Sequence, residues 1–201
     1  MVGLERGRLG EVMARLHNYA ERWTPPIEFT RRRLDWDGLF GEGAGFAVSP
    51  QEIWISLPRR YAELFEAVAE KVRQTMIDLG DGPDVLGLIH ADLHTKNILF
   101  SDKETRVIDF DDSGFGYRVY DMAVSLLVNG NPDLRDDFFQ GYARHRPVPE
   151  DQLEFLDTFI AARRASDVSW MTGQAQHHPD FRQNSSRWLE STAQAFRRFL
   201  Q

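Results

Sequence analysis

The sequence predicts a mostly helical α+β domain with one small β-hairpin set into it. Apolar residues recur at helical spacing near both ends of the chain, beginning with Leu9, Val12, Met13 and Leu16. Between the helical regions lie three short strand-like runs, GLIH, NILF and RVIDF. A length of 201 residues suits one domain with a sizeable core, so we expect a single domain over the whole chain.

The expected elements follow in order along the chain. An amphipathic helix over about 5–22 precedes an irregular arm over 23–58, whose most strand-like segment is EIWIS. A second helix ends near Gly80, where glycines begin. The last two strand-like runs flank Ser101-Asp102-Lys103-Glu104, which we expect to form a hairpin turn. Helices occupy about 118–200, and the first of them, containing YDMAVSLLV, is apolar nearly all round and should be buried.

The composition excludes several classes of function. The formal net charge of −7 and the lack of a basic stripe argue against a nucleic-acid partner. The chain has no cysteine, which excludes disulfides and thiolate zinc sites. No apolar run is long enough to span a membrane, and the first residues contain no hydrophobic signal core. We therefore expect a cytoplasmic protein with neither a membrane nor a nucleic-acid partner.

A polar loop interrupts the strand-like runs in LIHADLHTKNILF, residues 88–100. Asp92 and Asn97 lie five residues apart in this loop, and Asp109 follows twelve residues after Asn97, at the end of an apolar strand. A carboxylate in such a loop can accept a hydrogen bond from an attacking hydroxyl, and amide and carboxylate oxygens are hard ligands for Mg²⁺. This spacing is that of the catalytic loop and metal-binding segment of kinases.

Two other interpretations of the polar residues remain open. His90 can be a structural imidazole that braces the loop rather than a base. His90, Asp92, His94 and Asp109 together could instead form the site of a metal-dependent hydrolase. That alternative leaves Asn97 and the strand context without an explanation.

The stretch HADLHTKNILF…VIDFDDSGFGYRVYDMAVSLL resembles the signature of the aminoglycoside phosphotransferase and choline kinase-like family of small-molecule kinases. GRLGEVMARLHNYAERW resembles the helix that precedes the catalytic loop in that family. The resemblance implies a C-terminal lobe of a protein-kinase-like fold, with ATP as phosphoryl donor and Mg²⁺ as cofactor. It implies that Asp92 is the catalytic base, that Asn97 and Asp109 hold magnesium, and that Asp121 is structural. The catalytic loop would span 90–97.

The same region departs from protein kinases in ways that bear on the acceptor. Ala91 stands where protein kinases have an arginine, and His94 where serine/threonine kinases usually have a lysine. Asp111 replaces the glycine of Asp-Phe-Gly in the expected metal-binding segment, 107–112. Only eleven residues separate Asp109 from Asp121, too few for an activation segment that docks a peptide. We therefore expect the hydroxyl of a small molecule as acceptor.

The nucleotide-binding features of the family have no clear match in the sequence. GEGAGF, residues 41–46, lacks the third glycine of a phosphate-covering loop. Lys71, Lys96 and Lys103 lie on a helix, in the catalytic loop and in a turn, so none suits the strand lysine. We therefore expect a C-terminal lobe with the N-terminal nucleotide lobe absent, and possible self-association through the exposed cleft face.

The acceptor site is the least defined part of the prediction. His94, Asp112 and Trp170 are candidates for binding the acceptor, since acids and aromatic faces suit a cationic amine. Tyr117 and Tyr120 are further aromatic candidates, with core packing as the alternative for each. The main alternative to an enzyme is a non-catalytic pseudoenzyme or binding module that lacks the ATP lobe.

Overall fold

The computed structural model describes residues 2–44, 53–54, 57–101, 104–129, 134–175 and 178–201. The chain divides into two compact units, and each combines two segments that lie far apart in the sequence. The first unit comprises Met1–Arg31 and Asp81–Leu156, and the second comprises Arg32–Gly80 and Asp157–Gln201. The described part of the chain is mostly helical with a few short strands, in agreement with the predicted α+β class.

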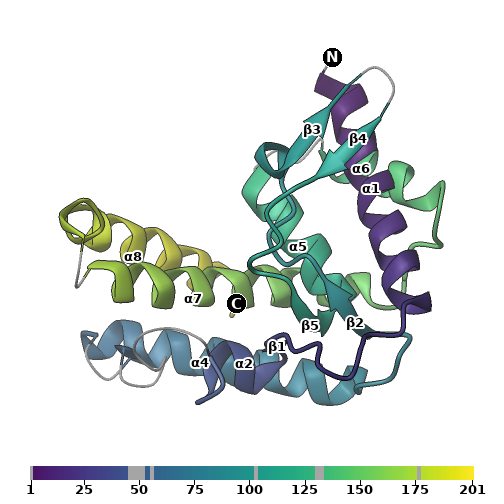
Figure 1. The fold of residues 1–201 in the computed structure, drawn as a ribbon. Helices are drawn as coiled ribbons and strands as arrows, with labels where there is room; N and C mark the ends of the chain where they lie inside the picture. Colours follow the sequence, from purple (N-terminus) through teal and green to yellow (C-terminus); the bar gives the residue numbers. More distant parts are fainter. Residues whose placement is uncertain (1, 45–52, 55–56, 102–103, 130–133, 176–177) are drawn as a thin grey trace. The chain divides into compact units, whose positions relative to one another are not determined.

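The first unit is built on the packing of helix α1 (Val2–Arg22) against α6 (Leu134–Ala143) (Figure 1). Two glycines let these helices approach closely. A Cβ atom on Gly10 would lie 1.9 Å from the carbonyl oxygen of Phe138, and one on Gly141 would lie 1.9 Å from that of Gly7. Any larger residue at either glycine would push the two helices apart.

Two antiparallel strand pairs flank the polar loop of the first unit. Strand β2 (Leu86–Ile89) pairs with β5 (Gly114–Tyr117), so that Leu86 lies opposite Tyr117. Strand β3 (Ile98–Phe100) pairs with β4 (Thr105–Val107) in the predicted hairpin. A short 3₁₀ helix, η1 (Thr95–Asn97), leads from the loop into β3.

Helix α5 (Arg118–Asn129) follows β5 directly, and the 3₁₀ helix η2 (Leu153–Phe155) lies near the end of the first unit. The prediction that α5 is buried is confirmed along its first two turns, where Tyr120, Met122, Ala123 and Val124 are at most 1% exposed. Val128, near its end, is 46% exposed. The buried side chains of α5 therefore come from the part of the helix up to Ser125.

The second unit is a helical assembly with an aromatic core. It contains a two-residue strand, β1 (Arg33–Leu34), and the helices α2 (Trp36–Phe40), α4 (Arg59–Leu79), α7 (Leu156–Ala175) and α8 (Pro179–Phe199). Phe65 of α4 packs edge-on against Phe196 of α8, with ring centroids 5.0 Å apart. Helix α4 ends at Gly80, whose φ of 71° is readily adopted only by glycine.

Two local predictions differ from the structure. The strand expected around EIWIS is wrong, since Ile53 and Trp54 are helical and buried. The rest of that segment, and residues 45–46 of GEGAGF, lie outside the described residues. The segment GFGY was not predicted as a strand, because two glycines weaken a strand signal; pairing with β2 determines its conformation instead. None of the helices in the described chain is long and apolar enough to cross a membrane.

Candidate catalytic site

Helix α5 holds the backbone of the polar loop through two side chains one turn apart. The carboxylate of Asp121 accepts hydrogen bonds from the backbone N–H groups of His90 (3.1 Å) and Ala91 (2.8 Å). The hydroxyl of Ser125 donates to the carbonyl oxygen of Leu93. Because residues four apart share one face of a helix, this face of α5 determines where the loop can lie.

Asp121 is itself held by α1. Its Oδ2 atom lies 3.1 Å from Nε2 of His17, whose Nδ1 lies 2.9 Å from the hydroxyl of Tyr142. Burial alone would raise the pKa of Asp121, but the hydrogen bond and charge of His17, with contributions from His90 and Ala91, lower it below its usual value. Asp121 is therefore an ionised, fully buried anchor.

His17 and Ser125 were not identified as site residues from the sequence. His17 occupies the same buried stripe of α1 as Met13, four residues earlier, and is 1% exposed. The sequence does show that His17 is a polar residue on an apolar helix face. That pattern does not reveal which residue is the partner of His17. Ser125 follows Asp121 by four residues on α5, a spacing that gains meaning only once Asp121 is known to contact the loop.

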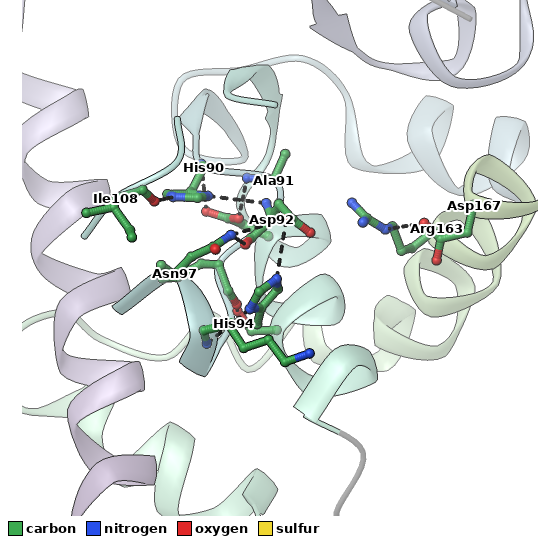
Figure 2. A network of polar contacts seen from close by, with 12 residues as sticks. His90, Ala91, Asp92, His94, Asn97, Ile108, Arg163 and Asp167 are labelled. Carbon is green, nitrogen blue, oxygen red and sulfur yellow. Dashed lines mark hydrogen bonds and ion pairs between the residues drawn. The ribbon is translucent and has the colours of Figure 1, made fainter. Parts of the chain in front are cut away.

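His90 joins the polar loop to the segment that follows β4. Its Nδ1 accepts a hydrogen bond from the N–H of Asp92 (3.3 Å), so the ring proton lies on Nε2, which donates to the carbonyl oxygen of Ile108 (3.1 Å; Figure 2). The N–H of Ile108 donates in turn to the carbonyl oxygen of Asn97 (3.0 Å). Hydrogen bonds therefore connect the backbone of Ile108 to both ends of the polar loop.

The side chains of Asn97 and His94 both contact Asp92 (Figure 2). Nδ2 of Asn97 donates to the backbone carbonyl of Asp92 (3.0 Å) and to its Oδ2 atom (3.2 Å), and neither of these bonds uses the amide oxygen. Nε2 of His94 lies 3.5 Å from the same Oδ2 atom. The N–H of Lys96 donates to Nδ1 of His94 (3.2 Å), so the proton of His94 also lies on Nε2, toward Asp92.

Asp109 follows Ile108 directly and has an exposed side chain. Asp109 and Ala91 both adopt the left-handed backbone region, with φ of 65° and 64°. Aspartate tolerates this region, whereas for alanine it costs on the order of 1 kcal/mol. The hydrogen bond that the N–H of Ala91 donates to Asp121 offsets this cost, and strained backbone of this kind is concentrated at functional sites.

The remaining candidate residues have other surroundings. Asp112 is half-buried, and the backbone carbonyl of Asp111 accepts a hydrogen bond from Arg31 (3.4 Å). Trp170 belongs to the second unit, where its ring packs edge-on against Phe181 with centroids 5.3 Å apart. Tyr117 and Tyr120 are buried, so they pack in the core.

The donor set determines which metal the site suits. Both ring nitrogens of His90 are engaged within the protein, and within the described part of the chain no group of three or more His, Asp or Glu side chains is arranged to hold a metal. The hydrolase alternative therefore has no support here. The amide oxygen of Asn97 and the carboxylate of Asp109 are hard oxygen donors of the kind that could hold an Mg²⁺ ion whose other ligands come from phosphates and water.

Comparisons with known proteins place the chain in a family. The family model of the phosphotransferase enzyme family matches residues 5–156. An uncharacterized protein from Deinococcus radiodurans is 32% identical over 175 residues, which cover 83% of this chain and 49% of that protein. The chain thus spans about half of the length of this curated relative.

Solved structures of kinases share the fold. A microcompartment-associated aminopropanol kinase matches 98% of this chain with 62% of its own, at a TM-score of 0.82 and 27% identity. An amicoumacin kinase matches with a TM-score of 0.71 and 19% identity, over 96% of this chain and 59% of its own. A choline/ethanolamine kinase family protein from Mesorhizobium loti matches with a TM-score of 0.70 and 17% identity, over 97% of this chain and 64% of its own. The chain belongs to the phosphotransferase enzyme family, with the protein-kinase-like fold of its small-molecule kinases.

Proposed function

We propose that the chain is the catalytic lobe of an ATP-dependent phosphotransferase that acts on a hydroxyl group of a small molecule. The observation that carries the proposal is the pair of hydrogen bonds at the backbone of Ile108, one from His90 and one to Asn97. These bonds join the segment that contains Asp109 to the loop that contains Asp92 and Asn97. A base and two oxygen ligands on adjoining segments are the parts that phosphoryl transfer requires. Membership of the phosphotransferase enzyme family supports the same reaction class.

Each residue has a distinct role in this proposal. Asp92 accepts a hydrogen bond from the attacking hydroxyl and takes its proton, while Asn97 and His94 fix the orientation of its carboxylate. Asn97 and Asp109 would hold Mg²⁺, which neutralises charge on the donor phosphates when bound. Catalysis then comes from positioning and electrostatics, and no covalent intermediate on the protein is needed.

We infer an amino alcohol as the class of acceptor. The solved structure with 27% identity is named as an aminopropanol kinase, and its own acceptor is thus an amino alcohol. The short link between Asp109 and Asp121 favours a small acceptor over a peptide. Asp112 remains our candidate for contacting the ammonium group, because a half-buried carboxylate suits a cation.

The decisive experiment measures ATP-dependent phosphorylation of aminopropanol, ethanolamine, choline and an aminoglycoside by a purified form of the protein that also contains a nucleotide-binding lobe, because none is predicted from this sequence. Asp92→Asn should lower kcat by about a thousandfold and leave KM for ATP within about threefold, because it removes the base but no nucleotide contact. Asp81→Asn, which changes an exposed carboxylate outside the catalytic loop and the metal-binding segment, is the matched control and should retain activity. Unchanged turnover in Asp92→Asn would refute the role of Asp92. Saturable binding of an amine with no turnover of any acceptor would support the binding-module alternative.

A further inference from the structure

The first unit contains a polar cavity that shares no residue with the catalytic loop. It has a volume of about 470 Å³ and lies between α1, the start of α5 and the loop that follows α6. Its charged lining residues are Glu21, Asp84, Arg118 and Arg146. Neither the family resemblance nor the proposed reaction assigns a role to this cavity.

Arg118, the first residue of α5, is the unusual feature of the cavity. It is only 5% exposed, and its Nη1 atom is buried with no hydrogen-bond partner among the described residues. Its Nη2 atom lies 4.0 Å from Oε1 of Glu21, beyond hydrogen-bonding distance. Burial lowers the pKa of Arg118, and the charge of Arg146 lowers it further. A buried guanidinium with an unused donor is costly unless a counterion pairs with it.

The acidic residues of the cavity do not supply that counterion. Both carboxylate oxygens of Glu21 accept hydrogen bonds from Arg146, at 2.7 and 3.3 Å. Arg146 also donates to the side-chain oxygen of Asn18 at 2.9 Å. Asp84 is exposed to solvent, where water screens its charge. Arg146 thus occupies both carboxylate oxygens of Glu21, and no carboxylate among the described residues accepts a hydrogen bond from Nη1 of Arg118.

From this arrangement we infer that the cavity binds a small oxyanion, a phosphate or carboxylate group, through Nη1 of Arg118. The planar guanidinium offers directed, charge-assisted hydrogen bonds to such groups. A volume of about 470 Å³ greatly exceeds the roughly 30 Å³ share of one water molecule, so the cavity can take a phosphate with its hydration or a larger molecule that carries it. The inference is independent of the proposed function.

The test is a titration of the chain with inorganic phosphate, and separately with acetate, at constant ionic strength. NMR of the arginine Nε–Hε groups follows binding at Arg118. We expect saturable binding with one site in the millimolar range or tighter, and preference between the two ions identifies the oxyanion class. Arg118→Lys should weaken binding about tenfold, because the ammonium keeps the charge but loses the planar donors. Arg118→Met should abolish binding.

Two further variants separate phosphate binding at Arg118 from a general effect of net charge. Arg144→Met removes an exposed arginine that pairs with Glu11 outside the cavity, and it should leave phosphate affinity within about twofold. Glu21→Gln removes the competing negative charge, so it should tighten phosphate binding. Without an added oxyanion, Arg118→Met should unfold at the same temperature as the wild type or higher, because an apolar side chain replaces an uncompensated buried cation.

Several outcomes would overturn the inference. Equal loss of affinity in Arg118→Met and Arg144→Met would mean that phosphate responds only to net charge. Weaker binding in Glu21→Gln would place the anion elsewhere. Strong destabilisation of Arg118→Met in oxyanion-free buffer would mean that the guanidinium is satisfied within the protein, which leaves no vacant donor for a ligand.

Discussion

The two compact units both bury apolar side chains but differ in the buried polar groups among them. In the first unit, a chain of buried polar groups runs from Tyr142 through His17 to Asp121, which holds the catalytic loop. In the second unit, helices pack through aromatic rings, among them Phe40, Trp54, Phe65 and Phe196. Helices satisfy their own backbone hydrogen bonds, so their packing needs only complementary apolar surfaces.

The loop at residues 90–97 satisfies only some of its backbone groups internally, as when the N–H of Asn97 donates to the carbonyl oxygen of His94. Its first backbone N–H groups find their acceptor in Asp121, and the carbonyl of Leu93 finds its donor in Ser125. Buried polar groups are costly unless they are fully satisfied, but once satisfied they allow one arrangement and few others. In the first unit, the buried polar network therefore selects one conformation of the loop. In the second unit, apolar packing of the helices is enough.

Removal of the polar anchor should have the largest effect on stability. Asp121→Ala leaves two backbone N–H groups and His17 without their acceptor, so we expect a loss of about 3–5 kcal/mol in the free energy of unfolding. Urea denaturation measures this loss. Asp111→Ala, at an exposed carboxylate, should cost less than about 0.5 kcal/mol. Equal effects of the two substitutions would mean that the buried network does not stabilise the first unit.

Trimming the aromatic core should cost less and leave the loop unchanged. Phe65→Leu keeps an apolar side chain at a fully buried position, so we expect a loss of about 1–2 kcal/mol. Amide NMR signals of residues 90–97 should stay in place, whereas Asp121→Asn should shift them. Loop signals that move equally in both variants would contradict the contrast between the units.

The acid sensitivity of the fold should depend on Asp121. Its pKa is lower in the folded state than the ordinary value near about 3.9, so its contribution to stability is complete above that value and is lost as the pH falls through the folded pKa. Stability of the wild type should therefore decrease below about pH 4. In Asp121→Asn the decrease should be shallower, as measured by urea denaturation over an acidic pH series. An identical pH profile would show that other carboxylates account for the acid response.

The smallest effect should come from His94, which orients Asp92 without anchoring the loop. His94→Ala should lower kcat about tenfold and change the free energy of unfolding by less than about 1 kcal/mol. His94→Gln, which can still donate a hydrogen bond to Asp92, should recover part of kcat. His145→Ala, at an exposed histidine, is the control. A higher KM for the acceptor with kcat unchanged would instead assign His94 to acceptor binding.

The sequence by itself determined the features that depend on neighbours along the chain. The periodicity of apolar residues predicted the first helix, which the structure extends from Val2 to Arg22, and the helix that ends before Gly80. The turn residues at Ser101–Glu104 predicted the hairpin. The spacing of Asp92, Asn97 and Asp109 identified the candidate site, because kinases carry this chemistry on two adjoining segments.

Contacts between distant residues were decided only by the tertiary structure. The strand Gly114–Tyr117 forms because β2 pairs with it, and its own two glycines give little strand signal. His17 reaches Asp121 across 104 residues, and the vacant donor of Arg118 becomes visible only when the residues around it are known. Local propensity reports on the nearest residues in sequence, whereas the partner of a buried polar group is set by how the helices and strands pack together.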